Sequence, residues 1–345
     1  MKKVKIIAEI GPNHNGSYNN AKKLIYKLSK LDVDFIKFQF ANPYKVYSED
    51  SFKANYQKKN DVQRTVIEMS QQNQLNINEH IKLYKLCLSL KKKYACSFFD
   101  LDGLKQLNSI IKLPFFKIPS GEICSVDMLK YISSQKKKVL LSTGMADLKT
   151  ISKTINILKN KKRLILMHCV SSYPTKAENI NLNFIDTLKK NFKTSVGFSD
   201  HTRDDVSAIG AIAKGAEYIE KHVTLNNNLQ GPDHKTSLNF SDFKKFVKRI
   251  RNFEKVLGSF NKNFLKDEIN VKRMSRKSIV TKNNIKKGER IKIKDICFKR
   301  PGTGFNPFYL KFFINKKVKT NILKNRLLKS EHLFIKKKNL KKYLN

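Results

Sequence analysis

The sequence predicts a (β/α)8 barrel, or TIM barrel, followed by a small β-rich domain, and three observations support this α/β fold. Short apolar runs alternate with longer amphipathic stretches as far as Leu257 in the 345-residue chain. The alternation supplies eight strand candidates, the number that such a barrel needs. Near Arg276 the pattern changes to short apolar runs separated by turns that contain Gly and Pro, which is typical of a small β-rich unit.

The eight expected strands are short and are separated by stretches with helical periodicity. The strands are expected at 4–10, 34–39, 94–99, 115–119, 138–142, 164–169, 195–199 and 218–223. Helices long enough to return to a parallel strand are expected between them, among others at 19–31, 78–92, 148–158, 204–214 and 241–257. Residues 41–76 are too many for a simple strand-to-helix loop, so we expect a functional excursion over the open end of the barrel.

These patterns also predict the domain boundaries. Residues 1–260 are the expected catalytic barrel, 261–275 a polar and basic linker without strands, and 276–345 the small domain. Short strands are expected in this domain at 277–280, 290–293 and 297–299. A unit of about 70 residues has a small core, so packing against another surface is expected to stabilise it.

The chain is strongly basic, with 71 Lys and Arg against 28 Asp and Glu and a formal net charge of +43. Such a charge can indicate a nucleic acid or an anionic membrane as partner. The lysines are spread along the whole chain without an RNA-binding aromatic motif, which favours a solvated surface and argues against both partners. The five cysteines form no C-x-x-C pair, and no signal peptide or membrane span is recognised, so we expect a soluble protein of the reducing cytoplasm.

Polar residues stand at the carboxyl end of nearly every expected strand, where barrels of this kind place their reactive groups. Two lysines, several hydroxyls, carboxylates and imidazoles around one opening suit an anionic, oxygen-rich substrate. In chain order these residues are Glu9, Lys37, Gln39, Ser97, Lys117, Ser120, Glu122, Ser142, His168, Tyr173, Ser199, His201, Glu220 and His222.

The histidines and Lys117 allow specific interpretations. His201 and His222 follow adjacent strands, each beside a carboxylate in the sequence, so they can bind one metal ion and leave positions open for water or substrate. His168 is the weaker candidate, and Cys169 is expected to be a packed thiol. Lys117 is either a Schiff-base lysine, as in some aldolases, or a clamp for phosphate or carboxylate, and the residues alone leave both open.

Motifs along almost the whole chain resemble those of the sialic acid (N-acetylneuraminate) synthase family. In the barrel they are residues 8–11 (AEIG), 13–16 (NHNG), 37–39 (KFQ), 116–122 (FKIPSGE), 141–145 (LSTGM), 197–202 (GFSDHT), 220–224 (EKHVT) and 231–234 (GPDH). Residues 276–280 (RKSIV) and 299–304 (KRPGTG) look like the family's C-terminal SAF domain, an antifreeze-like domain with a β-clip fold.

The resemblance implies a nonulosonic acid synthase, a transferase that uses phosphoenolpyruvate to form a C–C bond. Phosphoenolpyruvate would condense with an N-acetylmannosamine-type sugar and water, giving N-acetylneuraminate or a related 2-keto-3-deoxy acid and phosphate by C–O cleavage. A divalent metal, usually Mn²⁺ with Mg²⁺ or Co²⁺ as alternatives, would activate the sugar aldehyde. The resemblance also implies a homodimer that swaps its SAF domains.

Three alternatives to this activity remain. The acceptor 2,4-diacetamido-2,4,6-trideoxymannose would make the enzyme a legionaminic acid synthase, and the sequence of residues 120–123 is closer to sialic and legionaminic acid synthases than to pseudaminic ones. A Schiff-base aldolase on the same barrel and a basic nucleic-acid-binding module are the alternatives of other classes. Expulsion of phosphate from a tetrahedral intermediate needs stabilised negative charge and no imine, which favours the clamp interpretation of Lys117.

Matched motif by motif, the resemblance assigns roles to individual residues. His201 and His222 would hold the metal, and Glu9, Lys37, Lys117 and Asp233 would be catalytic, with Glu9 guiding the attacking water. The residues expected to bind phosphoenolpyruvate are Lys37, Ser97, Lys117, Ser120, Ser142, Ser171, Tyr173 and Ser199. Those expected to bind the sugar are Gln39, Glu122, Asp233 and, from the SAF domain of the other subunit, Arg300.

Two positions depart from the family's pattern. Ser97 and Phe98 stand where the family usually has Thr-Pro, so the hydroxyl is kept and the stiffening by proline is lost. Ser171 and Ser172 stand where an Asn often precedes the Tyr-Pro pair. We expect the shorter donor to shift the phosphoenolpyruvate contact or the substrate preference.

Overall fold

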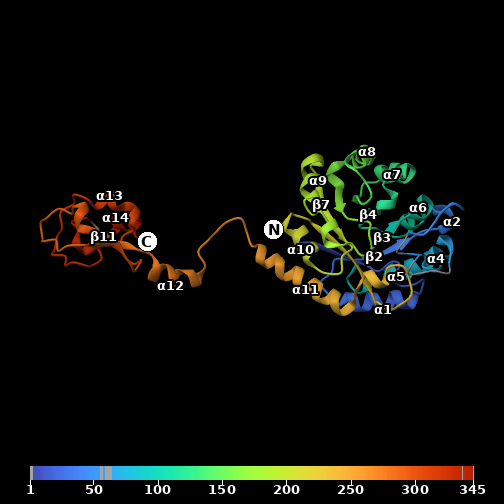
Figure 1. The fold of residues 1–345 in the computed structure, drawn as a ribbon, viewed down its shortest axis with the longest axis horizontal. Helices are drawn as coiled ribbons and strands as arrows, with labels where there is room; N and C mark the ends of the chain where they lie inside the picture. Colours follow the sequence, from blue (N-terminus) through green and yellow to red (C-terminus); the bar gives the residue numbers. More distant parts are fainter. Residues whose placement is uncertain (1–2, 55–56, 59–63, 336, 345) are drawn as a thin grey trace. The chain divides into compact units, whose positions relative to one another are not determined.

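A computed structural model describes residues 3–54, 57–58, 64–335 and 337–344, and Figure 1 shows its fold. The chain divides into two compact units, Met1–Gly258 and Ser259–Asn345, which we describe one at a time. Among the described residues, no helix has both the length and the apolar character needed to cross a membrane.

The first unit is a closed barrel of eight parallel strands, as the sequence predicts. Each strand pairs with the next, and β1 also pairs with β8, which closes the barrel. A two-residue strand, β9 (Leu238–Asn239), pairs in parallel with the carboxyl end of β8. The barrel strands are β1 (Lys5–Glu9), β2 (Phe35–Phe40), β3 (Lys93–Phe98), β4 (Phe115–Ile118), β5 (Lys138–Ser142), β6 (Leu164–His168), β7 (Ser195–Asp200) and β8 (Tyr218–Thr224).

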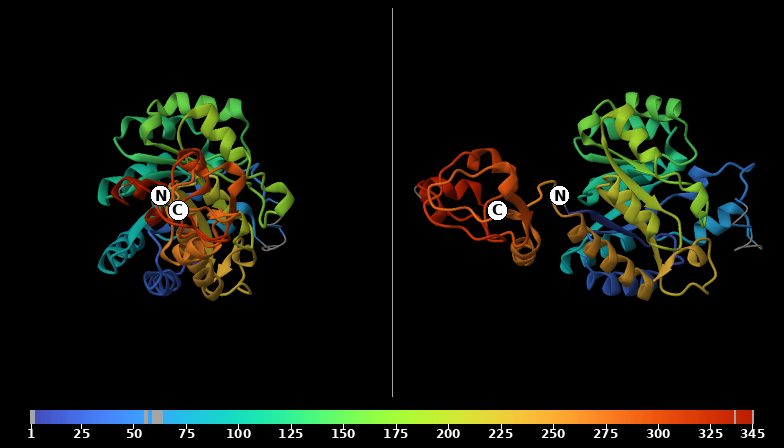
Figure 2. Two further views of the ribbon diagram at one scale, coloured as in Figure 1. Left: turned by 90° about the vertical axis from the view of Figure 1, so that its left-hand side faces the viewer. Right: turned by 60° about the vertical axis from the view of Figure 1, so that its left-hand side comes forward.

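Helices cover the outside of the strands, and Figures 1 and 2 show them around the barrel. The five helices expected by range are confirmed as α1, α5, α8, α10 and α11. The amino ends of α1, α5, α8 and α11 are capped by side chains; for example, Asn76 and Glu79 form a capping box at α5. The helices are α1 (Tyr18–Ser29), α5 (Ile77–Ser89), α6 (Leu101–Ile110), α7 (Val126–Ser134), α8 (Leu148–Leu158), α9 (Phe184–Phe192), α10 (Val206–Ala213) and α11 (Phe240–Leu257).

A layer of apolar side chains, which we call the apolar floor, fills the lower part of the barrel interior. Its buried members are Ile7, Phe35, Ala95, Phe115, Leu140, Ile165, Met167 and Tyr218. Side chains on a strand alternate between the two faces, so the residue two positions later points inward again, nearer the carboxyl end. On six of the strands that residue is polar: Glu9, Lys37, Ser97, Lys117, Ser142 and Glu220. The alternation therefore places a polar layer directly above the apolar floor.

The long segment after β2 forms the predicted excursion. It contains α2 (Pro43–Val46) and α4 (Val66–Gln72), and its residues line the cavity at the open end of the barrel. Residues 55–56 and 59–63 of this expected excursion lie outside the described residues. Close packing fixes its far end, since a Cβ at Gly16 would stand 2.1 Å from the backbone oxygen of Gln72.

The second unit has its own core, which includes Ile279, Phe305 and Phe313. Strands β10 (Ser278–Thr281) and β11 (Ile296–Lys299) pair antiparallel, and several short helices surround them: α13 (Leu310–Phe313), α14 (Lys337–Leu340) and the single turns η5 (Ile293–Asp295), η6 (Pro307–Tyr309), η7 (Ser330–His332) and η8 (Lys341–Tyr343).

One expectation about this part of the chain needs correction. The strand expected at 290–293 is wrong, because Arg290 forms an isolated bridge with Lys317 and Ile291 bonds the backbone of Asn315 and Lys316, but this pairing does not extend into a strand before η5 begins. The alternation of basic residues and Ile resembles a strand, although among the described residues no regular strand lies beside it. Within the expected linker, residues 266–275 form helix α12 (Lys266–Ser275), at whose start the Glu268 carboxylate accepts from the Leu265 backbone N–H at 3.0 Å.

The apolar floor gives a first prediction. Phe115 is 1% exposed and packs edge-to-face on Phe35 with ring centroids 5.0 Å apart. Phe115→Ala should lower the free energy of unfolding by about 3 to 5 kcal/mol, because it leaves a cavity under the polar layer. Urea unfolding followed by circular dichroism measures this. The control Phe52→Ala, at a side chain 82% exposed, should stay within about 0.5 kcal/mol of the parent protein; equal losses would contradict the role of the floor.

Candidate active site

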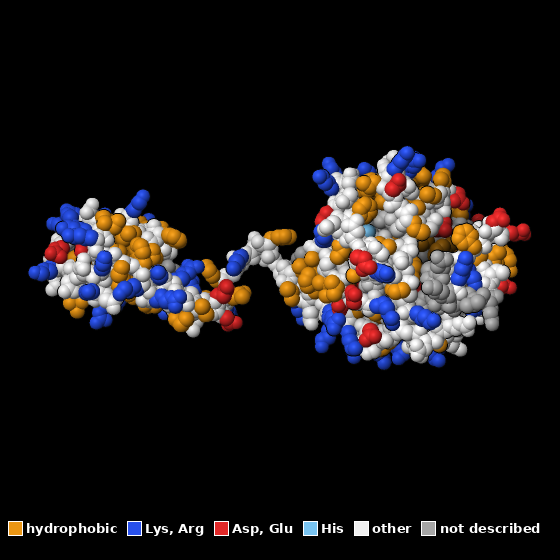
Figure 3. Space-filling view, viewed as in Figure 1, with side chains coloured by type: hydrophobic (Ala, Val, Ile, Leu, Met, Phe, Trp, Pro, Cys, Tyr) orange, Lys and Arg blue, Asp and Glu red, His pale blue; other side chains and the backbone are white. Residues whose placement is uncertain are grey.

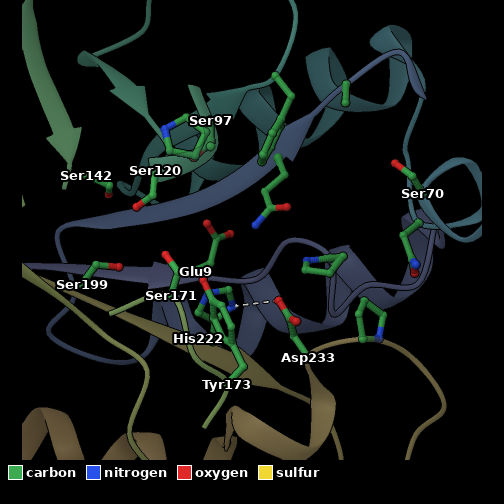
Figure 4. A pocket seen from close by; sticks show the side chains of 18 of the residues that line it. Glu9, Ser70, Ser97, Ser120, Ser142, Ser171, Tyr173, Ser199, His222 and Asp233 are labelled. Carbon is green, nitrogen blue, oxygen red and sulfur yellow. Dashed lines mark ion pairs between the residues drawn. The ribbon is translucent and has the colours of Figure 1, made fainter. Parts of the chain in front are cut away.

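A cavity of about 350 Å³ opens at the carboxyl ends of the barrel strands. Strand ends and the loops after them form its base, and Tyr47, Gln57 and Ser70 of the excursion form its outer wall. Figure 4 shows the serines and Glu9 at one end and Ser70 at the other. The cavity is thus long enough to offer a deep polar end and a separate outer end.

A buried cluster of opposite charges occupies the deep end. The Glu220 carboxylate lies between two ammonium groups, 3.7 Å from Nζ of Lys37 and 3.5 Å from Nζ of Lys117. Lys37 also pairs with Glu9 and donates to Ser97 Oγ at 2.7 Å. All four charged side chains are at most 4% exposed.

Burial and neighbouring charge set the protonation of this cluster. Burial lowers the pKa of Lys37 to about 8, against the opposing attraction of Glu220. Burial alone would raise the pKa of Glu220, but Lys117 and Lys37 outweigh it and hold that pKa at about 2. At neutral pH the cluster therefore keeps Lys37 protonated and Glu220 ionised.

Serine hydroxyl groups at the carboxyl ends of β4, β5 and β7 lie around the cluster. Lys117 donates to Ser142 Oγ at 2.7 Å, and Ser199 Oγ donates to Glu220 at 3.0 Å. Ser120 Oγ accepts from the Gly144 backbone N–H at 3.1 Å and lies 3.2 Å from the Cys169 sulfur. Hydroxyls and ammonium groups in this density can bind the oxygens of a small polyanion.

Two imidazoles stand beside the cluster. The ring centroids of His201 and His222 are 5.7 Å apart, and burial lowers the pKa of both, so both are neutral at neutral pH. His201 Nδ1 donates to the Val170 carbonyl oxygen at 2.7 Å, which leaves Nε2 with its lone pair. His222 Nδ1 is buried without a hydrogen-bond partner, 3.6 Å from the Asp233 carboxylate. Figure 4 marks this approach.

This donor set suits a divalent ion that keeps ligands other than protein. Neutral imidazoles with free lone pairs are common ligands of such ions, and the bond from His201 to a carbonyl is the kind of contact that orients a metal ligand. Within the described parts of the chain, no three His, Cys, Asp or Glu side chains gather closely enough to hold an ion by themselves. Two imidazoles would therefore leave several coordination positions to water or substrate.

Asp233 closes the cavity on the side of His222. Its carboxyl group is buried, and burial raises its pKa to about 7. The loop that bears it is bound firmly to the rest of the barrel: Ser237 Oγ donates to the Asp233 carbonyl oxygen at 2.7 Å and accepts from Asn13 Nδ2 at 2.7 Å. A carboxyl group in this state can hold or release a proton near neutral pH.

Comparison with known proteins identifies the family of the chain. The family model described as the NeuB family matches residues 24–262. The chain belongs to the NeuB family. It is 38% identical, over 95% of its length and 100% of the relative, to the N,N'-diacetyllegionaminic acid synthase of Campylobacter jejuni. It is 34% identical, over 95% of its length and 94% of the relative, to the protein of the same name from Legionella pneumophila.

A solved structure of a similar protein agrees with this family. The chain is 30% identical to an N-acetylneuraminic acid synthetase from Leptospira borgpetersenii, crystallised with citrate, at a TM-score of 0.70. That comparison covers 78% of this chain and 90% of the other. The barrel of this NeuB-family chain and its family resemblance, both expected from the sequence, are thereby confirmed.

The structure brings most of the predicted site residues of this NeuB-family chain into one cavity. The Tyr173 ring packs against the His201 ring with centroids 4.2 Å apart and planes tilted by 34°, and Gln39 is held by a bond from its Nε2 to the Gly11 carbonyl oxygen at 3.0 Å. The predicted residues that line the cavity are Glu9, Lys37, Gln39, Ser97, Lys117, Ser120, Ser142, Ser171, Tyr173, Ser199, His201, His222 and Asp233.

Three residues singled out from the sequence lie elsewhere. Glu122 is not part of the cavity lining, and its carboxylate accepts from Ser125 Oγ on its own loop. His168 points outward and bonds through Nε2 to the Ile180 carbonyl oxygen at 2.7 Å. Arg300 belongs to the second unit, where it is exposed and lines a surface pocket of that unit.

The structure adds two observations about carboxylates of the NeuB-family site. Asp200, the neighbour of His201 in the sequence, turns away from the cavity and pairs with Lys221 at 2.8 Å. Glu220 received no role from the sequence, yet it lies at the centre of the charge cluster. The signal was available: Glu220 is two residues before His222 on the same strand, so both face inward.

Gly144 gives a prediction about the hydroxyl wall. A Cβ at Gly144 would stand 2.4 Å from Ser171 Oγ and 2.8 Å from Ser120 Oγ. Gly144→Ala should therefore displace these hydroxyls and weaken binding of a small anion such as inorganic phosphate by about tenfold, or 1.4 kcal/mol. Isothermal titration measures the affinity. Gly121→Ala is the matched control, because a Cβ there meets nothing within 4 Å; a loss in the control as large as that in Gly144→Ala would count against the wall.

Proposed function

We propose that this chain is a nonulosonic acid synthase that condenses phosphoenolpyruvate with an acylated mannosamine-type sugar and releases phosphate. The observation that carries the proposal is the buried Lys37–Glu220–Lys117 cluster next to a wall of serine hydroxyls. A small molecule with a phosphate and a carboxylate is the kind of ligand that two ammonium groups and several hydroxyls bind together. The names of the relatives support the same class of reaction.

Lys37 and Lys117 act in this proposal as an electrostatic clamp. Lys117 is 3.5 Å from the Glu220 carboxylate and donates to Ser142, so both contacts use its Nζ as a hydrogen-bond donor and do not leave it as the free nucleophile that imine formation needs. This supports the clamp interpretation over the Schiff-base aldolase. The negative charge that grows on the departing phosphate is then met by groups already in place.

The bond changes balance without an added oxidant or reductant. C3 of phosphoenolpyruvate attacks the aldehyde carbon of the open-chain sugar, and the aldehyde oxygen becomes a hydroxyl. Water adds at C2, and the C2–O bond to phosphate breaks to leave the 2-keto acid. Glu9 lies next to Lys37 at the cavity base, where its carboxylate can orient this water. Asp233, with a pKa of about 7, can move a proton at the sugar oxygen.

We further propose that His201 and His222 hold a divalent ion, Mn²⁺ first and Mg²⁺ or Co²⁺ as alternatives. When bound, such an ion supplies polarisation of the aldehyde C=O bond. The two neutral imidazoles and the orienting bond from His201 to Val170 support this assignment. Asp233 is close enough to His222 to support its orientation.

Two acceptor sugars remain in view, N-acetylmannosamine and 2,4-diacetamido-2,4,6-trideoxymannose. The two relatives at 38% and 34% identity are both N,N'-diacetyllegionaminic acid synthases, which favours the diacetamido sugar. The outer wall of the cavity supports this choice, because Gln57 and Asn73 offer amides to a second acylamino group while Val46 and Met69 suit a methyl group in place of a hydroxymethyl group.

The remaining parts of the proposal concern assembly. We propose that the second unit is an SAF domain and that two chains exchange these domains in a homodimer, so that Arg300 meets the sugar bound by the other chain. The motif at 299–304 and the exposed position of Arg300 support this. The high net charge needs no nucleic-acid partner, since the Lys and Arg side chains on the face seen in Figure 3 are scattered among other side chains.

Phosphate release tests the reaction directly. Purified full-length protein is incubated with phosphoenolpyruvate and Mn²⁺, with either sugar or without sugar, and phosphate is measured. Release that depends on the diacetamido sugar is the expected result, and Lys117→Met should abolish it. Release without any sugar, or none with either sugar at adequate metal, would contradict the proposal.

The pKa of Lys37 predicts a pH dependence. The side chain is protonated below about pH 8 and neutral above it, so kcat/KM for phosphoenolpyruvate should fall about tenfold per pH unit above about pH 8. Steady-state kinetics from pH 6.5 to 9.5 measure this. In Lys37→Arg the side chain stays charged, so the fall should disappear; a fall that persists unchanged would assign it to another group.

Arg300 gives a prediction about the sugar alone. Loss of a charge-assisted hydrogen bond costs about 1.5 to 3 kcal/mol, so Arg300→Ala should raise KM for the sugar about tenfold or more and leave KM for phosphoenolpyruvate unchanged. Arg290→Ala is the matched control, because Arg290 donates to the Asn315 carbonyl oxygen within its own unit. Equal changes in both KM values would exclude this role of Arg300.

A further inference from the structure

Lys221 is a buried lysine of the barrel that the proposed reaction does not use. It lies on β8 between Glu220 and His222, so its side chain points to the opposite face of the strand, away from the cavity. It is 1% exposed, and its Nζ stands 5.5 Å from the centre of the Phe246 ring on α11. A charge buried among helices needs a reason, because desolvation of the ammonium group is costly.

The ammonium group of Lys221 is bound entirely to the segment that carries His201. It donates to Asp200 Oδ2 at 2.8 Å, to the Thr202 carbonyl oxygen at 2.7 Å and to Thr202 Oγ1 at 3.2 Å, and it also reaches the Asp204 carbonyl oxygen at 3.0 Å. Asp200 precedes His201 in the chain, and Thr202 and Asp204 follow it. Lys221 therefore binds a side-chain carboxylate just before His201 and two backbone carbonyl oxygens after it.

A second set of bonds makes this contact rigid. Asp200 Oδ1 accepts from the Thr202 backbone N–H at 2.9 Å and from Thr202 Oγ1 at 2.8 Å. Asp200 and Thr202 are 1% and 4% exposed, so water does not compete for these bonds. We call Asp200, Thr202 and Lys221 the His201 clamp.

Stability alone is a weak explanation for the clamp. Apolar side chains of similar volume often replace a buried ion pair at no cost in stability, because they avoid its desolvation. Apolar side chains, however, cannot form the hydrogen bonds that hold the backbone around His201 in one conformation. The clamp forms these bonds at the one residue of this segment whose ring faces the cavity, and the bond from His201 to Val170 then fixes the rotation of the ring.

We infer that Lys221 is a positioning residue that acts through Asp200 and Thr202 to aim the His201 imidazole toward His222 for metal binding. The inference rests on the proposed function, because it requires His201 to bind a divalent ion. Outer contacts that orient metal ligands change metal affinity about 10- to 100-fold when they are removed. The His201 clamp should therefore determine metal affinity, whereas binding of phosphoenolpyruvate by Lys37 on β2 and Lys117 on β4 should not depend on it.

The test measures Mn²⁺ binding to the full-length protein by electron paramagnetic resonance of the free ion. Lys221→Met should weaken Mn²⁺ binding about 10- to 100-fold and raise the Mn²⁺ concentration needed for half-maximal activity, with KM for phosphoenolpyruvate unchanged. Two variants guard against misfolding. The double variant Asp200→Asn with Lys221→Met removes both buried charges, and Thr202→Val keeps the volume and charge while it removes the hydroxyl bonds.

A matched control separates positioning from general loosening of the barrel. Arg251 is a partly buried cation that also binds carboxylates, contacting Asp32, Asp34 and Glu254, but it lies at the amino ends of the strands, whereas both histidines stand at the carboxyl ends. Arg251→Met should reduce stability and keep Mn²⁺ affinity within twofold of the parent protein.

The outcomes distinguish failure of the inference from failure of the proposed function. If the parent protein binds Mn²⁺ and the folded clamp variants bind it as tightly, the positioning role is overturned and the metal site stands. If Arg251→Met loses as much affinity as Lys221→Met, the effect is loss of rigidity and the inference is again overturned. If the parent protein binds no Mn²⁺, Mg²⁺ or Co²⁺, the metal part of the proposed function fails and the inference fails with it.

Discussion

The buried attraction between Glu220 and the two lysines is the constraint on which the rest of the site depends. Each of the three charges by itself would be costly to bury, and each is tolerable only while the other two remain within a few ångströms. Lys37, Lys117 and Glu220 lie on different strands, β2, β4 and β8. The cluster is therefore stable only in a barrel whose strands keep their register. The apolar floor beneath it excludes water that could otherwise solvate an unpaired charge.

Strand register supplies the required accuracy. Paired positions on neighbouring strands are Glu9 with Lys37, Ser97 with Lys117, and Ser199 with Glu220. Each pairing places a carboxylate or hydroxyl beside a group of complementary charge at the same height in the barrel. Loops provide the rest of the site, and they are fixed by side chains that face away from the cavity. His234, for instance, bonds to Thr224 Oγ1 and to Asn15 Oδ1, and thereby joins the loop that bears Asp233 to the loop after β1.

The sequence predicts much of this because the relevant signals are local. Short apolar runs mark every barrel strand, stretches with a period of 3.6 mark the helices between them, and polar residues stand where most of the apolar runs end. Local signals do not show which residue or strand, distant in the sequence, a given residue pairs with in the fold. Asp200 and His201 are adjacent, but a lysine on β8 takes Asp200 outward. The residues at 290–293 alternate like a strand, but no second strand lies beside them. Both outcomes depend on residues distant in the chain.

The distribution of charge also explains how an unusually basic chain can keep a selective site. The barrel cavity holds two lysines, yet Glu9 and Glu220 pair with them, so the cavity is much closer to neutral than the surface. A ligand binds there only if its oxygens interact with the ammonium groups more strongly than Glu9 and Glu220 do. Alternatively, its own negative charge must be large enough for the ammonium groups to bind it together with these carboxylates. A molecule with two separated anionic groups meets that condition, whereas a simple monoanion does not. In the proposed function, selectivity for such a molecule would arise from its competition with Glu9 and Glu220 for the two lysines, and the surface charge would contribute to encounter with anions rather than to discrimination between them.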